Sequence, residues 1–233
     1  MSAEGLSVLV PMKPLASAKM RLAPEVDDMT RQGVALSMLD RVVRAAAEAF
    51  GAPACRVVGG DALVEEVALE AGGEWAPEQG HDLNSSLALA MMRAWREGAR
   101  AALVIAGDLP MASAADLRAI VEASGGLTRP VGVMAIADGG TNALLWPRDA
   151  RFPPGFGERS FSRHQAAAAA AGAPLAQATA AGLAFDLDTA ADLAYAVGAV
   201  PGFREAAAAW TRRVQLWRAA HPQCAPWEAD GDE

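Results

Sequence analysis

Three aspartates stand where their carboxylates could bind a divalent cation. Asp108 directly follows the apolar run AALVIAG, and Asp186 and Asp188 stand two positions apart in AFDLDTAADL. In extended backbone such a pair shares one face, about 6.6 Å apart, and its like charges would repel without a cation between them. Mg²⁺ prefers carboxylate and phosphate oxygens as ligands. We therefore expect a magnesium site here, although Asp108 could instead form a turn before Pro110, and Asp188 could cap the following helix.

A basic loop follows the first apolar run of the chain. Lys13, Lys19 and Arg21 fall within nine residues in PMKPLASAKMRLAP, although the whole chain carries a net charge of −8. Cationic side chains and loop N–H groups can surround a triphosphate and stabilise pyrophosphate as it leaves. The spacing of a Walker-type P-loop is absent. The pattern therefore favours a phosphate clamp of another kind, and the alternative is a solvated basic turn.

Small hydrogen-bonding residues gather in two later segments. The first, DGGTNALLWP, contains Thr141, and the second, GFGERSFSRHQ, contains Gly157, Ser160 and His164. The second segment is typical of a helix start, where backbone N–H groups bind anions, so a second phosphate or a carboxylate could dock there. Ser160 could equally be a plain N-cap, and His164 is expected on the helix surface.

A fourth polar segment, PEQGHDLNSSLALA, leads into a helix through Gly80, Asn84 and Ser85. Its polar atoms could read the edge of a purine base. An ordinary N-cap at Asn84 or Ser85 explains the same residues. Nowhere in the chain does the order of serine, histidine and aspartate, or of cysteine and histidine, support a covalent nucleophile.

The elements that must position these residues alternate between strands and helices. Apolar runs predict the strands, and apolar residues at helical spacing predict the helices. Such alternation predicts a largely parallel sheet covered by helices, which binds its ligands at the carboxyl ends of the strands. The predicted strands are 6–10, 55–58, 101–106, 131–136 and 143–146, and the predicted helices are 29–50, 62–71, 84–98, 114–123, 162–171 and 203–220.

Length and composition limit the classes of function. The 233 residues suit one large α/β domain, which we place at residues 1–200, followed by a C-terminal helical extension and acidic tail at 201–233. The net charge of −8 disfavours a nucleic-acid surface. Because a basic leader and an apolar run of about 18 residues are both missing, we expect a cytoplasmic protein that does not bind membranes. Cys55 and Cys224 lack metal-ligand spacing and are expected to be bystanders.

Six segments, taken in order, resemble one family of nucleotidyltransferases. They are VPMKPLASAKMRLAP, GHDLNSSLALA, VIAGDLPM, DGGTNALLWP, FGERSFSRHQ and FDLDTAADL, and they span roughly residues 6 to 200. The chain resembles the 2-phospho-L-lactate guanylyltransferases of deazaflavin coenzyme F-420 biosynthesis. The resemblance implies a Rossmann-like α/β nucleotidyltransferase fold of the nucleotide-diphospho-sugar transferase type. It also implies GMP transfer from GTP to a phosphorylated three-carbon acid, with release of pyrophosphate.

The resemblance further implies a role for each candidate residue. The implied magnesium ligands are Asp108, Asp186 and Asp188. The residues implied to hold the phosphorylated acid are Thr141, Gly157 and Ser160. The implied catalytic residues are Lys13, Lys19, Arg21 and Asp108, and the implied nucleotide contacts are Pro11, Lys13, Gly80, Asn84, Ser85 and Gly107.

The acceptor phosphate is already anionic, so the reaction needs alignment and charge neutralisation rather than a general base or a covalent intermediate. The resemblance favours phosphoenolpyruvate over 2-phospho-L-lactate and 3-phospho-D-glycerate, and it implies a downstream transferase that takes the labile product. Helix 203–220 is the candidate contact for a homodimer. Two alternatives stay open. One is a molybdenum-cofactor guanylyl- or cytidylyltransferase, whose opening loop is usually richer in glycine, and the other is a non-catalytic nucleotide-binding protein.

Overall fold

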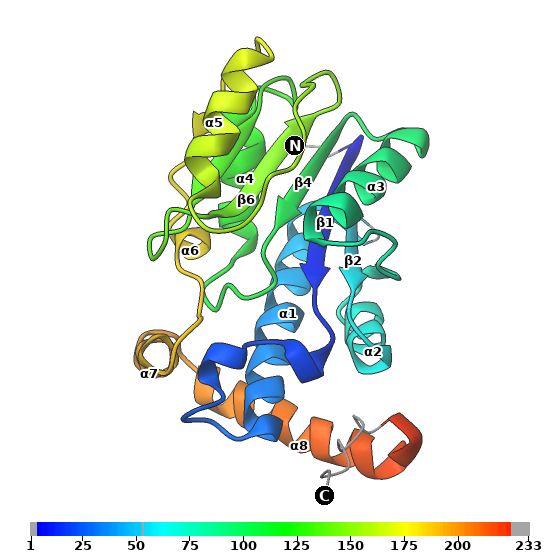
Figure 1. The fold of residues 1–233 in the computed structure, drawn as a ribbon, viewed down its shortest axis with the longest axis vertical. Helices are drawn as coiled ribbons and strands as arrows, with labels where there is room; N and C mark the ends of the chain where they lie inside the picture. The colour runs from blue at the N-terminus through cyan, green and yellow to red at the C-terminus, as the bar shows by residue number, and fades with distance from the viewer. Residues whose placement is uncertain (1–3, 53, 225–233) are drawn as a thin grey trace, which may run out of the picture.

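The computed structural model describes residues 4–52 and 54–224, and it contains a seven-stranded sheet with helices packed on both of its faces (Figure 1). The strands are β1 (Leu6–Met12), β2 (Cys55–Gly59), β3 (Glu74–Ala76), β4 (Ala101–Ile105), β5 (Val131–Met134), β6 (Thr141–Pro147) and β7 (Ala176–Gln177). The helices are α1 (Asp28–Phe50), α2 (Ala62–Glu70), α3 (Leu83–Arg96), α4 (Ala114–Ala123), α5 (Ser160–Ala170), α6 (Ala181–Ala184), α7 (Ala190–Ala199) and α8 (Phe203–Ala220). Short 3-10 turns lie at Leu15–Ser17, Met20–Leu22 and Pro222–Cys224.

The strands are arranged in the order β3-β2-β1-β4-β6-β5-β7. Strands β1 to β4 are mutually parallel, whereas β6 runs antiparallel to both of its neighbours. Ile105 of β4 pairs with Ala143 of β6, and the next residue, Ala106, donates its N–H to the Asn142 carbonyl at 2.8 Å. The reversed strand β6 therefore begins at the edge where β4 ends, and it carries Thr141 to the same edge as Asp108.

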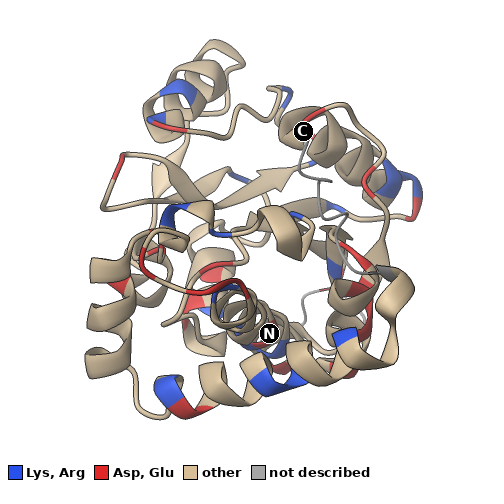
Figure 2. Cartoon of the chain, turned by 60° about the horizontal axis from the view of Figure 1, so that its bottom comes forward, with Lys and Arg blue, Asp and Glu red and all other residues tan. Residues whose placement is uncertain are grey.

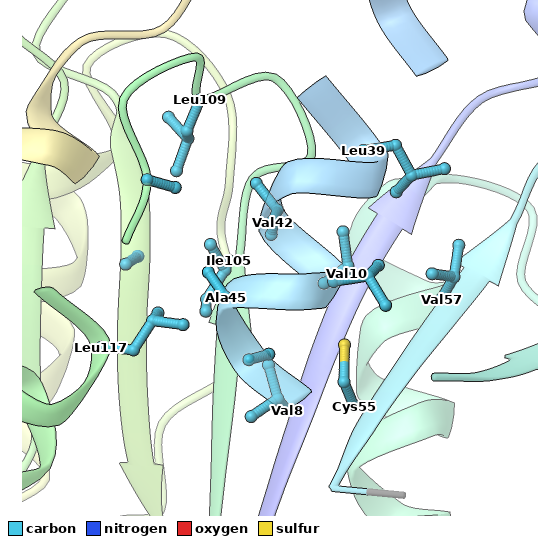
Figure 3. Close-up of a cluster of buried hydrophobic side chains, with 14 of the residues drawn as sticks. Val8, Val10, Leu39, Val42, Ala45, Cys55, Val57, Ile105, Leu109 and Leu117 are labelled. Atoms are coloured by element: carbon cyan, nitrogen blue, oxygen red, sulfur yellow. The ribbon is translucent and has the colours of Figure 1, made fainter. Parts of the chain in front are cut away.

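Each face of the sheet is buried by its own helices. Val8 and Val10 of β1 are fully buried in a cluster with Leu39 of α1, and Figure 3 shows these side chains meeting between the helix and the strands. Leu9, which points to the opposite face, packs in a second cluster with residues of α3 and α5. Alternate burial of this kind is what a sheet covered on both faces requires. Each fully buried aliphatic side chain contributes about 2 kcal/mol.

A third cluster lies under the loops at the carboxyl edge of the sheet. Leu22 of the first loop and Leu187 pack there with Ala196 of α7 and with Phe203 and Ala207 of α8. Leu187 and Leu22 are fully buried. The two C-terminal helices therefore help to position both the basic loop and the segment that carries Asp186 and Asp188.

Helix α8 crosses below α1 at the bottom of the view in Figure 1 and packs against it, and glycine permits their close approach. A Cβ atom at Gly33 of α1 would lie 2.5 Å from the backbone nitrogen of Thr211 in α8. The division into a catalytic domain and a C-terminal extension stays a prediction, and the acidic tail lies outside the described residues.

The five predicted strands and six predicted helices are confirmed to within a few residues. The prediction did not include β3, β7 and α6, which are too short for a periodic pattern, and it included α7 only as the helix that Asp188 could cap. Basic and acidic segments are interspersed over the described helices and do not form one basic face (Figure 2). None of the helices in the described ranges is long and apolar enough to cross a membrane.

Candidate active site

The first loop is held in place by Arg31, a buried residue of α1. Its guanidinium donates to the carbonyl oxygens of Leu15 at 3.2 Å and Ala16 at 3.1 Å, and also to that of Ala18. Asp28, one turn earlier in α1, pairs with the same guanidinium. Because buried carbonyl oxygens need donors, this side chain helps to fix the path of the loop, together with Asp61, whose Oδ2 accepts the Leu15 N–H at 2.7 Å.

Lys19 lies at the centre of the predicted charged site. Its Nζ donates to Asp108 Oδ2 at 2.5 Å and to Asp188 Oδ1 at 2.7 Å, and only 9% of its side chain is exposed. Its backbone has φ = 54°, a left-handed conformation that is uncommon outside glycine. Burial by itself lowers the pKa of Lys19, but the charges of Asp108 and Asp188 outweigh it and raise the pKa above its ordinary value. The ammonium group therefore stays protonated and joins the first loop to both aspartates.

Arg21 and Lys13 lie on the exposed side of the same group. Arg21 Nη1 donates to Asp188 Oδ2 at 3.1 Å, while 74% of the arginine side chain remains exposed. Burial raises the pKa of Asp188, but the charges of Lys19, Arg21 and Lys13 outweigh it and hold the pKa below its ordinary value. The structure thus brings the three cations of the predicted phosphate clamp together around one carboxylate.

Asp186 and Asp188 flank Leu187, which ties their segment to Asp108. The Leu187 N–H donates to the Asp108 carbonyl oxygen at 3.1 Å. Residues 185–188 lie outside the strands of the sheet, and the charges of Asp108 and Asp188 both act on Asp186. The alternative that Asp188, with Thr189, caps the following helix is right for the helix and for Thr189 but not for Asp188, because Thr189 caps α7 through a bond from the Asp192 N–H.

The aspartates carry negative charge that the protein balances only in part. Asp108 Oδ1 is buried and has no hydrogen-bond partner among the described residues. Burial raises the pKa of Asp186, a hydrogen bond from Asn142 opposes this effect, and the charges of Asp108 and Asp188 add to it. Unbalanced carboxylate oxygens of this kind suit a hard divalent cation.

A metal site is nevertheless not fully formed by the aspartates alone. In the part of the chain that the structure describes, no group of three or more His, Cys, Asp or Glu side chains lies close enough together to hold a metal ion. The Lys19 ammonium group lies between Asp108 and Asp188. The magnesium ligands therefore stay a prediction.

A cavity of about 680 Å³ opens beside Lys19, and we call it the nucleotide cavity. Several predicted catalytic and nucleotide-binding residues line it, namely Pro11, Lys13, Lys19, Arg21, Gly107 and Asp108. Beyond β1 its lining changes to residues of β2, of the segment after β3 and of α3, namely Val58, Glu78, Leu83, Ser86 and Leu87. The cavity is therefore charged where the aspartates lie and mostly apolar beyond them.

Two predicted nucleotide contacts, Asn84 and Ser85, do not line the nucleotide cavity. The Asn84 amide donates to the Phe156 carbonyl at 3.2 Å and accepts from the Phe156 N–H at 2.7 Å, which ties α3 to the later loop. Ser85 forms a capping box with Asp82, and Asp82 is the N-cap of α3. The expectation of a cap at Asn84 or Ser85 is therefore wrong by two or three positions.

Gly80, the third predicted contact in this segment, shapes a turn. Its N–H donates to Ser86 Oγ at 3.1 Å, and Ser86 Oγ in turn donates to Glu78 Oε1 at 3.0 Å. A Cβ atom at Gly80 would lie 2.3 Å from the Ser86 nitrogen, so only glycine fits. The segment therefore presents Glu78 and Ser86 to the cavity instead of the residues expected.

Thr141, Ser160 and His164 form a buried group that we call the acceptor cluster. Ser160 Oγ donates to Thr141 Oγ1 at 3.0 Å, and His164 Nδ1 lies 2.9 Å from the same oxygen. The Gly155 N–H donates to His164 Nε2 at 2.9 Å, so the ring proton must lie on Nδ1, which donates to Thr141. Since Thr141 Oγ1 accepts both bonds, its own hydroxyl proton remains available to a ligand.

His164 is 1% exposed, so the expectation that it lies on the helix surface is wrong. It makes edge contacts with Trp146 and Phe156, whose ring centroids lie 5.4 and 5.0 Å from its own. Burial lowers the pKa of His164 to about 4, and the nearby positive charge of Arg163 adds to the effect. The imidazole is therefore neutral at ordinary pH.

The residues predicted to hold the acid gather at the start of α5. Ser160 is the first residue of the helix, and not its N-cap as the alternative had it, because Arg159 occupies the N-cap position without a side-chain bond. The first two N–H groups of the helix are already bonded, that of Ser160 to the Gly157 carbonyl and that of Phe161 to the Gly139 carbonyl at 3.2 Å, so an anion at this helix start would bind the later N–H groups of the first turn. Gly157, at φ = 129°, accepts the Ser160 N–H at 3.1 Å through its carbonyl.

Asn142 connects the acceptor cluster to the aspartates. It follows Thr141 on β6, and its Nδ2 donates to Asp186 Oδ1 at 3.2 Å. It was not predicted as a site residue, and neither were Arg31 and Glu78. Asn142 could have been identified from its position beside Thr141, and Arg31 from its position as a charged residue on the apolar face of its helix. For Glu78 the sequence shows only that it lies in a polar segment.

Comparison with known proteins identifies the family of the chain. Residues 6–199 match the family described as Guanylyl transferase CofC like. The chain is 39% identical over 198 residues to the phosphoenolpyruvate guanylyltransferase of Sphaerobacter thermophilus, covering 83% of this chain and 93% of the relative. It is 38% identical over 188 residues to the phosphoenolpyruvate guanylyltransferase of Rubrobacter xylanophilus, covering 80% and 90%.

Solved structures share the fold. A protein of Desulfovibrio desulfuricans G20, described as a nucleotide-diphospho-sugar transferase, aligns with a TM-score of 0.70 at 20% identity over 94% of this chain and 96% of that one. CMP:2-keto-3-deoxy-manno-octonic acid synthetase complexed with CTP aligns with a TM-score of 0.52 at 14% identity, over 82% and 95%. These structures confirm the predicted Rossmann-like nucleotidyltransferase fold. Together with the family match over residues 6–199, the sequence relatives show that this chain belongs to the CofC-like guanylyl transferases.

Proposed function

We propose that this protein transfers GMP from GTP to phosphoenolpyruvate and releases pyrophosphate, as a step in deazaflavin coenzyme F-420 biosynthesis. The names of the two relatives described above support this activity. The structural observation that carries the proposal is the Lys19 ammonium group, held between Asp108 and Asp188 beside a cavity of about 680 Å³. A triphosphate needs fixed cations at such a place.

The chemistry is a direct displacement. An oxygen of the acceptor phosphate attacks the α-phosphorus of GTP and forms the new P–O bond. The bond from that phosphorus to the bridging oxygen breaks, and its electron pair leaves with pyrophosphate. In our proposal Lys13, Lys19 and Arg21 bind the triphosphate and balance the charge that develops on the leaving group. The acceptor oxygen is already anionic, so no side chain has to remove a proton.

We also propose that Mg²⁺ is the cofactor and that Asp108, Asp186 and Asp188 hold it. Two observations support this assignment: Asp108 Oδ1 is buried without a hydrogen-bond partner, and burial, with the charges of Asp108 and Asp188, raises the pKa of Asp186, an effect that a bound cation would oppose. A bound divalent cation would draw charge from the phosphate oxygens of the nucleotide. Lys19 holds Asp108 and Asp188 together against their mutual repulsion.

The acceptor cluster is proposed to bind the acid. The free hydroxyl proton of Thr141, and those first-turn N–H groups of α5 that the Gly157 and Gly139 carbonyls do not accept, offer neutral donors to a phosphate or carboxylate. Such donors would also suit 2-phospho-L-lactate and 3-phospho-D-glycerate. The names of the relatives favour phosphoenolpyruvate.

Three wider expectations belong to the same proposal. They are a cytoplasmic location, a downstream transferase that consumes the labile diphosphate product, and a homodimer. Leu216 of α8, with 72% of its surface exposed, offers an apolar contact for a second copy of the chain.

A single assay tests the activity and the cofactor. The purified protein is incubated with GTP, Mg²⁺ and each of the three acids in turn, and pyrophosphate is measured. We expect the highest kcat/KM with phosphoenolpyruvate and loss of turnover when EDTA removes the metal. Turnover only with molybdopterin as acceptor would overturn the proposed reaction. Turnover that persists in EDTA would overturn the proposed cofactor.

A further inference from the structure

The order of the strands places the nucleoside end of the nucleotide cavity. Asp108 follows β4 and Glu78 follows β3, and strands β1 and β2 lie between them. Three strand spacings therefore separate the two residues, about 14 Å. A nucleotide whose α-phosphate lies beside Lys19 and Asp108 extends its base past Pro11 and Val58 toward Glu78, since all five residues line the cavity.

The lining at this end suits the flat faces of a base. Val58 and Leu87 are buried beneath it, and Leu83, at the start of α3, is 40% exposed. Apolar walls of this kind hold a ring system without selecting one base over another. The polar side chains among them are Glu78 and Ser86. Selection of the base therefore falls to these two residues.

The Glu78 carboxylate is held at one oxygen and open at the other. Because Ser86 Oγ accepts the Gly80 N–H at 3.1 Å, its own proton is directed at Glu78 Oε1, 3.0 Å away. Oε2 accepts no hydrogen bond from the described residues, and Glu78 has no ion-pair partner among them. A Cβ atom at Gly59 would lie 3.7 Å from this free oxygen, so the missing side chain leaves room beside it. The free oxygen is an anionic acceptor whose donors must come from the ligand.

On the basis of the guanylyl transfer proposed above, we propose that Glu78 selects guanine by accepting hydrogen bonds from its N1–H and 2-amino groups. A carboxylate only accepts hydrogen bonds, and both of these guanine groups donate. Adenine and cytosine each present a ring-nitrogen acceptor at the corresponding edge, which the carboxylate repels. Attraction and repulsion together give the discrimination. Ser86 is a positioning residue that acts through Glu78.

Glu78→Gln is the discriminating variant, because it keeps the size of the side chain and turns one acceptor into a donor. Xanthine carries a carbonyl in place of the 2-amino group, so a glutamine amide can accept from its N1–H and donate to that carbonyl. We expect kcat/KM for GTP to fall by about 10- to 100-fold, and the preference for XTP over GTP to rise by about 100-fold. Pyrophosphate release with phosphoenolpyruvate and each nucleotide measures both. Glu205→Gln, an exposed position of α8 outside the cavity lining, is the matched control.

The ratio of kcat/KM for XTP to kcat/KM for GTP distinguishes a loss of base recognition from a general loss of activity. An equal loss with GTP and XTP in Glu78→Gln, or unchanged GTP turnover, would overturn the role of Glu78. Ser86→Ala should raise KM for GTP by about 3- to 10-fold and keep the wild-type order of nucleotides. A Ser86→Ala protein with wild-type KM would overturn the positioning role.

Calorimetric titration of GTP, XTP and CTP into the wild-type protein and Glu78→Gln, without any acid, measures nucleotide affinity apart from turnover. It therefore tests this inference separately from the proposed reaction. A nucleotide preference that changes between wild type and Glu78→Gln supports the inference, even if phosphoenolpyruvate proves not to be the acceptor. Tighter binding of CTP than of GTP by the wild-type protein would overturn both.

Discussion

The nucleotide cavity and the acceptor cluster begin at the same edge of the sheet, yet they hold their polar groups by different means. In the cavity, Lys19 and Arg21 pair with carboxylates, and 74% of the Arg21 side chain is exposed. In the acceptor cluster, Thr141, Ser160 and His164 are at most 7% exposed and are joined by neutral hydrogen bonds. One region depends on charge, and the other depends on burial and donor geometry.

The difference follows from the ligand proposed for each region. A triphosphate gains negative charge on its leaving group, so fixed cations contribute most there. A three-carbon acid has few atoms by which it can be aligned, so donors fixed before binding contribute most. Buried neutral groups avoid the desolvation cost of buried charges. Each variant below perturbs one of the two regions, and the resulting KM values show whether the regions act separately.

The largest effect is expected at Asp108. Asp108→Asn removes the carboxylate charge that faces Lys19, and turnover should fall by about 1,000-fold. Thermal stability should change little, because asparagine has nearly the same size and Lys19 keeps its bond to Asp188. Pyrophosphate release and thermal denaturation measure the two effects. The exposed Asp149→Asn is the control and should alter neither. Wild-type turnover in Asp108→Asn would remove this residue from the mechanism.

The next effect concerns the support of the nucleotide cavity. Arg31→Met should lower the free energy of unfolding by about 4 kcal/mol, because Asp28 and the loop carbonyls lose a buried cationic donor. KM for GTP should rise while KM for the acid stays constant. Arg44→Met, on the same helix, breaks an exposed ion pair with Asp40 and should cost less than about 1 kcal/mol. Urea denaturation compares the two, and equal costs would show that Arg31 does not hold the loop.

Much of this molecule could be predicted from local patterns. Apolar runs and helical spacing identify β1, β4 and α1, and a charged residue directly after a buried strand marks Asp108. The basic loop is visible because Lys13, Lys19 and Arg21 are close in sequence. These features depend only on residues that are close in sequence, so they can be predicted without knowing which distant segments are in contact.

The predictions that failed depend on contacts between distant segments. His164 is buried because α5 packs against Trp146 and Phe156, and a short Ala-rich helix does not reveal which face is covered. Asn84 bonds to Phe156, 72 residues away, and is therefore directed away from the cavity. Glu78 reaches the cavity only because β3, a strand of three residues, pairs with β2. Side-chain direction is set by such pairings, which composition and spacing do not encode.

Acid should weaken the acceptor cluster. The pKa of His164 is lowered to about 4 by burial and by Arg163, whereas an unfolded histidine has a pKa of about 6.5. Between these values the unfolded chain binds a proton that the native state does not bind. The contribution of His164 to the free energy of unfolding should therefore fall as the pH drops from about 6.5 to 4, by at most about 3 kcal/mol, and then level off.

Urea denaturation of wild type and His164→Gln across this pH range measures that contribution. The acid-dependent loss should shrink in the variant, because every other ionisable side chain is present in both proteins and its contribution cancels in the comparison. Equal pH dependence in the two proteins would show that His164 is not the titrating group.

The smallest effect is expected from one neutral hydrogen bond. Ser160→Ala removes the donor to Thr141 Oγ1, worth about 1 kcal/mol, and KM for the acid should rise about fivefold while KM for GTP stays constant. The control is Ser162→Ala, which removes an exposed hydroxyl bonded to the Arg159 carbonyl and should change neither value. If Ser160→Ala raised both KM values equally, the two regions would not be independent. The bond from Asn142 to Asp186 would then be the contact through which they are coupled.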